Sequence, residues 1–163
     1  IFDGRPRITL FGAGHVGQAV AAISRQLPIR LTVIDQRRVQ LKHVEANENI
    51  SIEHADSPIQ QVQQLSGAVA AIIMTHSHGL DYRLCEELVD KPNLLYVGLI
   101  GSKTKATKFR KALRVAGKTK KQISKITCPI GTKGPEGKEP GTIALAVLSE
   151  AMTAIAAANK VNK

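Results

Sequence analysis

Short apolar runs alternate with longer stretches of helical periodicity along this chain. The runs are rich in β-branched residues and are nearly continuous, as in strands covered on both faces. They are Arg7–Phe11, Arg30–Asp35, Ile50–Glu53, Val69–Met74 and Leu94–Val97. Strands separated by helices predict right-handed βαβ units and a doubly wound, mainly parallel α/β sheet. We expect the Rossmann-like order 3-2-1-4-5, to which a sixth strand near Ile126 could be added.

Capping residues and breakers place the helices between these strands. Pro28 ends a first helix at about Leu27, and Ser57 followed by Pro58 opens another. Ser102 is the expected N-cap of a helix with one apolar and one basic face, and Thr119 with Gln122 forms a capping box. The last segment, residues 140–158, reads as a long apolar helix. Such a helix either packs on the sheet or forms a homodimer with a second copy of the chain.

Length and composition favour one soluble domain. The chain has 163 residues, 43% of them hydrophobic and 22% charged, which suits a single domain with its own core. Two cysteines are too few for a disulfide scaffold. We find no secretory segment and no apolar span of 18 residues, so we expect a cytoplasmic protein with no membrane association.

The positive charge lies in one segment. Twelve of the 23 Lys and Arg residues lie between Asp90 and Glu136, where there is no acidic residue, while the rest of the chain has eleven basic and 13 acidic residues. Nucleic acid is an unlikely partner, because the chain has only five aromatic residues, no Trp and no reading motif. A phosphate-bearing ligand, with some charge left to dock an acidic partner, explains the segment better.

A glycine-rich turn follows the first predicted strand and opens a helix. Its spacing, G-x-G-x-x-G, is typical of turns that bind a pyrophosphate at a helix N-terminus. In this motif the first glycine permits the tight turn, the second lets backbone N–H groups approach the phosphates, and the third allows close packing of helix on strand. The candidate cofactor-binding residues here are Gly12, Gly14, His15, Val16 and Gly17. A Rossmann-like turn that binds another ligand, or none, is the alternative.

Asp35 ends the second strand, where a carboxylate would hold ribose hydroxyls. Its position favours NAD over NADP. Arg37 and Arg38 follow it and could instead accept a 2′-phosphate, so the choice between NAD and NADP stays open.

Polar residues also follow the fourth strand, at the predicted ligand edge of the sheet. The candidates are Thr75, His76, His78 and Asp81. Two histidines two residues apart could bind a metal, but no third ligand of clear spacing accompanies them, so we predict no metal site. We expect them to line the pocket and contact phosphate or substrate, although Ser77 or His78 could simply cap the next helix.

A second glycine turn with a helix N-terminus follows the fifth strand. Lysines in a first helical turn oppose the helix dipole, so an anion is expected to compensate them. The candidates are Gly101, Ser102, Lys103 and Lys105. The other reading is a solvated basic face on a surface helix.

Cys128 precedes a proline and a glycine-rich loop that we expect to wrap the ligand. Its thiol could handle sulfur or contact the cofactor, or it could be inert packing.

Five motifs, in order, resemble the Rossmann-type C-terminal domain of the xanthine dehydrogenase accessory factor (XdhC-like) proteins. They are FGAGHVG, THSHGLD, YVGLIGSKTKATKF, CPIG and GKEPGTIALAVLSE. The resemblance implies an accessory protein, more than a catalyst, that binds molybdenum cofactor. It would help a cysteine desulfurase add the terminal sulfur and deliver the cofactor to a xanthine dehydrogenase-like apoenzyme. The family carries a further N-terminal domain, so we expect residues 1–163 to be one Rossmann-like domain without it.

The residues alone leave another function open. An NAD-binding oxidoreductase, or an NAD-sensing regulatory domain, would use the same first glycine turn. An oxidoreductase needs a proton donor, for which only His76, His78 and Tyr96 are candidates.

Overall fold

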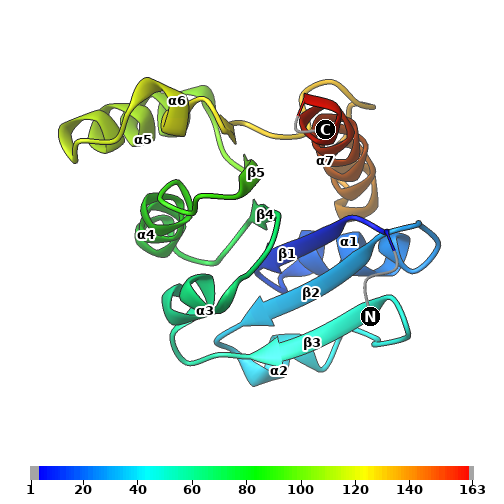
Figure 1. Cartoon of the computed structure of the whole chain (residues 1–163). Coiled ribbons are helices and arrows are strands. Elements are labelled where there is room, and N and C mark those ends of the chain that lie inside the picture. Colours follow the sequence, from blue (N-terminus) through cyan, green and yellow to red (C-terminus); the bar gives the residue numbers. More distant parts are fainter. Residues whose placement is uncertain (1–3, 162–163) are drawn as a thin grey trace.

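A six-stranded parallel sheet forms the centre of the computed structural model, which describes residues 4–161 (Figure 1). The strand order is β3-β2-β1-β4-β5-β6, which confirms the expected order and the sixth strand. The strands are β1 (Arg7–Phe11), β2 (Arg30–Asp35), β3 (Ile50–His54), β4 (Val69–Ile73), β5 (Leu94–Leu99) and β6 (Ile126–Thr127).

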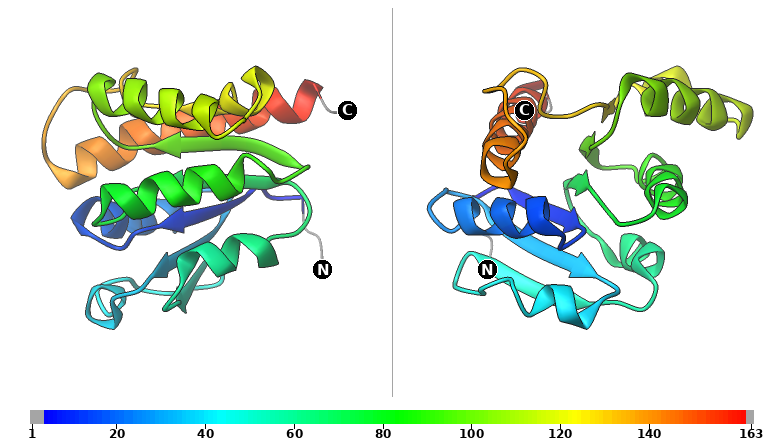
Figure 2. Two further views of the ribbon diagram at one scale, coloured as in Figure 1. Left: turned by 90° about the vertical axis from the view of Figure 1, so that its left-hand side faces the viewer. Right: turned by 180° about the vertical axis from the view of Figure 1, so that it is seen from behind.

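Helices cover both faces of the sheet (Figure 2). They are α1 (His15–Ser24), α2 (Arg38–Leu41), α3 (Pro58–Gln64), α4 (His78–Leu88), α5 (Lys103–Val115), α6 (Lys120–Ile123) and α7 (Pro140–Val161). One apolar core joins the sheet to α1, α2 and α7, and a second joins it to α3, α4, α5 and α6. Apolar residues thus point to both faces, as the continuous apolar runs of the sequence predict.

Several element ends differ from the sequence prediction. The first helix ends at Ser24. After it, the N–H groups of Gln26 and Leu27 donate to the carbonyl groups three residues earlier, those of Ile23 and Ser24, and no longer to those four residues earlier. Residues 38–41 form a short helix, α2, that the pattern did not predict. Ser57 is the N-cap of α3 but makes no side-chain capping hydrogen bond, whereas the capping box of Thr119 and Gln122 forms as expected.

Strand β5 is longer than predicted and has a glycine in its interior. A Cβ on Gly98 would lie 2.4 Å from the Ile130 side chain and 2.9 Å from the Tyr96 hydroxyl. The missing side chain is therefore needed for close packing, the usual reason for a glycine inside a strand.

The long C-terminal helix α7 packs on the sheet. Its buried residues, among them Val147, Leu148 and Ala151, face α1 and β5, while Leu145 is exposed. By length and mean hydropathy α7 would suffice to cross a membrane, so the expectation that no apolar span reaches 18 residues is wrong. One side of α7 packs against α1 and β5, and 33% of its most apolar 18-residue window is buried.

Candidate functional site at the carboxyl end of the sheet

The three glycines of the first turn differ in how closely other atoms approach them. Gly12 has a φ of +122°, and a Cβ there would lie 2.2 Å from the Met74 carbonyl oxygen. A Cβ on Gly17 would lie 2.2 Å from the Gly12 carbonyl oxygen. Gly14, by contrast, has no atom within 4 Å of its added Cβ. Gly12 and Gly17 hold helix against strand, and Gly14 leaves the backbone at the N-terminus of α1 open to an approaching group.

The Asp35 carboxylate joins this turn to the end of β2. It is 4% exposed and accepts the Ala13 N–H at 2.7 Å through Oδ2. Arg37 donates from its backbone N–H and Nε to Oδ1, at 2.8 and 3.0 Å, and from Nη2 to Oδ2 at 3.0 Å. Burial raises the pKa of Asp35, but these hydrogen bonds outweigh it and hold the pKa below its usual value. Asp35 therefore stays ionised near neutral pH.

A buried ion pair joins the first turns of α4 and α5, the helices that follow β4 and β5. Lys105 Nζ lies 2.7 Å from Asp81 Oδ2 and 2.9 Å from the Ile100 carbonyl oxygen. The Thr75 N–H and hydroxyl lie 3.0 and 2.6 Å from Asp81 Oδ1. Asp81 and Lys105 are 1% and 7% exposed, so each neutralises the other away from solvent.

The structure separates the two lysines that the sequence placed together as anion ligands. Lys103 is exposed, whereas Lys105 lies on the buried side of α5 with Nζ 5.3 Å from the Phe109 ring centre. Residues two apart on a helix point in nearly opposite directions, and Gly101 leaves room for the inward one, because a Cβ there would lie 2.5 Å from Lys105 Cδ. Ser102 Oγ accepts the Lys105 N–H at 3.1 Å and caps the helix, as predicted.

The two histidines are exposed at the same edge of the sheet. His76 lies in the loop after β4 and His78 starts α4, which Ser77 caps by accepting the Leu80 N–H at 3.3 Å. Within residues 4–161, no three His, Cys, Asp or Glu side chains are grouped to hold a metal ion. Tyr96, the third candidate proton donor, is buried in the core beneath α7, and burial raises its pKa to about 12.

Cys128 is half-buried at the end of β6 and packs beside the core under α4 and α5. Burial raises the pKa of its thiol, although Lys105 and Arg110 act in the opposite direction. The thiol is therefore protonated at neutral pH, which favours a packing role over a reactive one. Cys85 is fully buried in the same core, as its helical position predicts.

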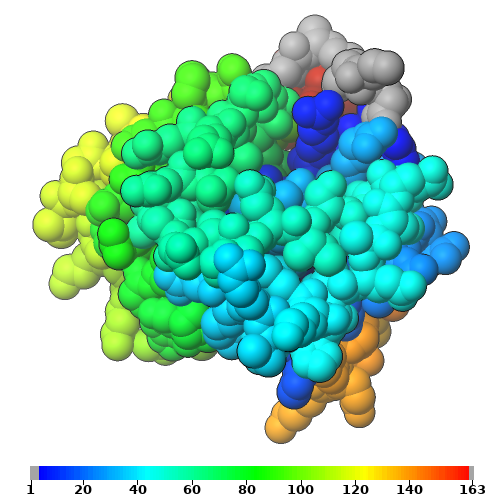
Figure 3. All heavy atoms as spheres, turned by 90° about the horizontal axis from the view of Figure 1, so that it is seen from below, coloured from blue at the N-terminus to red at the C-terminus, as the bar shows by residue number. Residues whose placement is uncertain are grey.

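The glycine-rich loop of residues 131–139 lies at the carboxyl end of the strands and projects from the body of the domain (Figure 3). Its middle is fixed to α7, because a Cβ on Gly134 would lie 2.5 Å from Ala146 Cβ. Residues 135–139 are exposed. Beside the first glycine turn lies a small, partly open hollow of about 10 Å³, so a ligand there would lie over the edge of the sheet and contact backbone N–H groups.

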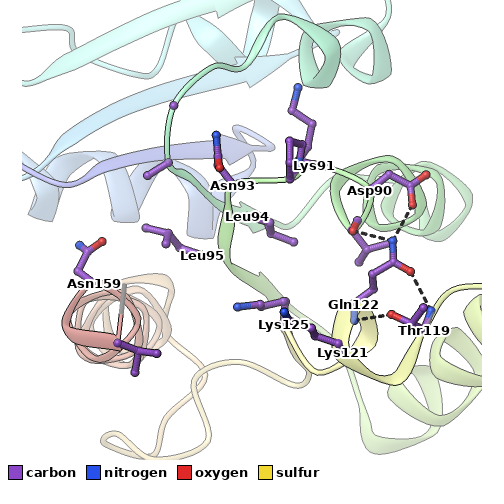
Figure 4. A pocket seen from close by; sticks show the side chains of 15 residues that line it. Asp90, Lys91, Asn93, Leu94, Leu95, Thr119, Lys121, Gln122, Lys125 and Asn159 are labelled. Carbon is purple, nitrogen blue, oxygen red and sulfur yellow. Dashed lines mark hydrogen bonds between the residues drawn. The ribbon is translucent and has the colours of Figure 1, made fainter. Parts of the chain in front are cut away.

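A larger hollow, of about 720 Å³, lies at the opposite, amino end of the sheet (Figure 4). The loop before β5, helix α6 and the end of α7 surround it. Lys91, Lys121 and Lys125 line it together with Asn93 and Asn159. The sequence does not predict this hollow, because no motif marks residues that come from four separate segments, the loop before β4 among them.

The family of the chain follows from comparison with known proteins. Residues 8–151 match the family model of the XdhC Rossmann domain. The chain belongs to the XdhC Rossmann domain family. The match covers both glycine turns and most of α7, so the resemblance expected from the sequence is confirmed.

Two relatives place this XdhC Rossmann domain within longer proteins. The uncharacterized protein YqeB of Escherichia coli K12 is 29% identical over 147 residues, which are 90% of this chain and 27% of YqeB. A crystal structure of a Bacillus halodurans protein, described as a xanthine dehydrogenase, has a TM-score of 0.74 at 20% identity. The aligned region covers 94% of this chain and 43% of the Bacillus halodurans protein. The chain thus spans between a quarter and half of these relatives, and the structural likeness shows a shared fold.

Proposed function

We propose that this domain binds a phosphate-bearing cofactor at the carboxyl end of its sheet. The cofactor is molybdenum cofactor, a nicotinamide dinucleotide, or each in turn. The observation that carries the proposal is the glycine turn before α1. The space beside Gly14 is empty, whereas backbone atoms lie against Gly12 and Gly17. Uncapped N–H groups at a helix N-terminus bind phosphate without a deep pocket.

The domain would use this site in the maturation of xanthine dehydrogenase-type molybdenum enzymes. Membership of the XdhC Rossmann domain family supports an accessory role of this kind. In this role the domain protects the cofactor and transfers it to the apoenzyme, and a cysteine desulfurase supplies the terminal sulfur. The exposed basic face of α5 offers a surface for an acidic partner.

An NAD-sensing regulatory domain is the second candidate, because the glycine turn, the helix that it opens and Asp35 at the end of β2 are arranged as in dinucleotide-binding folds. An oxidoreductase is less well supported. Tyr96 is buried in the core, which leaves only the exposed His76 and His78 as proton donors at this edge.

Calorimetric titration with molybdenum cofactor, NAD and NADP tests the site. We expect at least one of them to bind, and Gly14→Asp to weaken binding at least about tenfold, because a carboxylate would replace the space that a phosphate needs. Ala22→Asp, which adds the same charge to an exposed position of α1, is the matched control. Binding that survives Gly14→Asp would move the site away from this turn.

A further inference from the structure

We propose that the ribose-recognition corner of this domain selects a phosphate group instead of a ribose diol, and that the domain prefers a 2′-phosphorylated dinucleotide to an unphosphorylated one. This inference rests on the proposed function, because it assigns the ligand class of the same site. It is carried by the surroundings of Asp35 and Arg37.

Asp35 has no acceptor position left for a ribose. A carboxylate offers about four lone-pair positions. Two on Oδ1 are taken by the backbone N–H and Nε of Arg37, and two on Oδ2 by the Ala13 N–H and Arg37 Nη2. A diol that donates two hydrogen bonds to this carboxylate would have to displace the Arg37 guanidinium from a two-point, charge-assisted contact.

The same contacts remove the negative charge that would repel a phosphate. The Asp35 hydrogen bonds raise the pKa of Arg37 and fix its guanidinium at the end of β2. About a third of the Arg37 side chain remains exposed, and the neighbouring Arg38 is exposed as well. Arg37 and Arg38 against Asp35 leave one excess positive charge at this corner.

The next acidic group along the sheet edge belongs to β3 and its following loop. Asp56 is exposed, and its carboxylate lies 3.5 Å from His54 Nε2. Its backbone carbonyl accepts a hydrogen bond from the Gln36 side chain at 3.0 Å. This contact holds the backbone of Asp56 beside Gln36, which precedes Arg37, so the exposed Asp56 carboxylate is one negative charge near this corner. Asp56→Asn is therefore expected to strengthen binding of the phosphorylated ligand modestly.

The test compares NADP with NAD by calorimetry on the folded chain. We expect NADP to bind at least about tenfold more tightly than NAD, and Arg37→Ala to reduce this ratio at least about tenfold. Arg37→Ala should weaken NADP binding, because it removes a cation from the phosphate. It should strengthen NAD binding, because it releases Asp35 for the ribose diol. Arg38→Ala should weaken NADP less, and Arg114→Ala, at an exposed position of α5, should change neither ligand.

Three outcomes would overturn the inference. One is NAD binding that equals or exceeds NADP binding. Another is a ratio that Arg37→Ala leaves unchanged while circular dichroism and thermal unfolding show an intact fold. The third is binding of molybdenum cofactor with no affinity for either dinucleotide, which leaves the proposed function standing. Failure of all three ligands to bind would instead contradict the proposed function itself.

Discussion

The two ends of the sheet are built in opposite ways. The carboxyl end has two glycine turns and two ion pairs whose carboxylates are buried, whereas the amino end has a hollow of about 720 Å³ lined by lysines and amides. At the carboxyl end the paired carboxylates are buried, whereas at the amino end the hydrogen-bonded side chains of Asp90, Thr119 and Gln122 border open space. Cavity volume alone does not mark an anion site in such a fold, because helix N-termini recognise anions through ordered N–H groups at a surface.

The largest expected difference concerns two ion pairs of equal length. Lys105–Asp81 and Lys118–Asp90 are both 2.7 Å, but Asp81 is buried and Asp90 is half-exposed. Asp81→Ala should lower the free energy of unfolding by about 3–5 kcal/mol, because it leaves a buried ammonium unpaired. Asp90→Ala should cost less than about 1 kcal/mol. Urea unfolding of both variants checks this, and similar losses would break the comparison.

Acid should act mainly at the carboxyl end. The pKa of Asp35 is lowered in the folded state, so its contribution to stability is present above the unfolded value of about 3.9 and is lost as the pH falls through the lower folded value. Asp35→Asn should therefore cost about 1–3 kcal/mol at pH 7, with a difference from the parent chain that shrinks below pH 4. Thermal unfolding from pH 7 to pH 3 measures it. A constant difference across this range would contradict the assignment.

The glycines of the first turn should separate stability from binding. Gly17→Ala should cost about 1–3 kcal/mol, because the new methyl group would meet the Gly12 carbonyl. Gly14→Ala should change stability by less than about 1 kcal/mol, since the space around it is open. Unfolding experiments measure stability and calorimetry measures ligand affinity for both variants. Gly14→Ala should lower ligand affinity and not stability. Equal losses of stability would mean that Gly14 is also a packing glycine.

The smallest effect is expected at the amino end. Lys121→Glu with Lys125→Glu reverses two charges around the large hollow, yet it should leave cofactor affinity unchanged and stability within about 1 kcal/mol. Lys103→Glu, at the exposed start of α5, is the matched change at the carboxyl end and should weaken binding. A loss of affinity in the Lys121 and Lys125 variant would assign part of the cofactor site to the hollow.

The sequence predicted the sheet well because strand order in this fold follows from local signals. Apolar runs, glycine turns and the capping residue Ser102 are all read within a few residues of the chain. The site was predicted less completely, because its decisive contacts join distant residues. Nothing local indicates that Lys105 pairs with Asp81, 24 residues earlier, although the helix period already separates Lys103 from Lys105. Arg37 donates three hydrogen bonds to the carboxylate of Asp35, two residues earlier. This contact is local, but it depends on a backbone bend that no residue type reveals.

Helix α7 comes last in the chain but covers α1, which comes first among the helices. During synthesis the apolar side of α1 and β1 must therefore stay uncovered until residues 144–155 have left the ribosome. The first three strands can pair before that, since their partners are already made. The apolar face that α7 will cover is then open to contact with other chains until α7 docks.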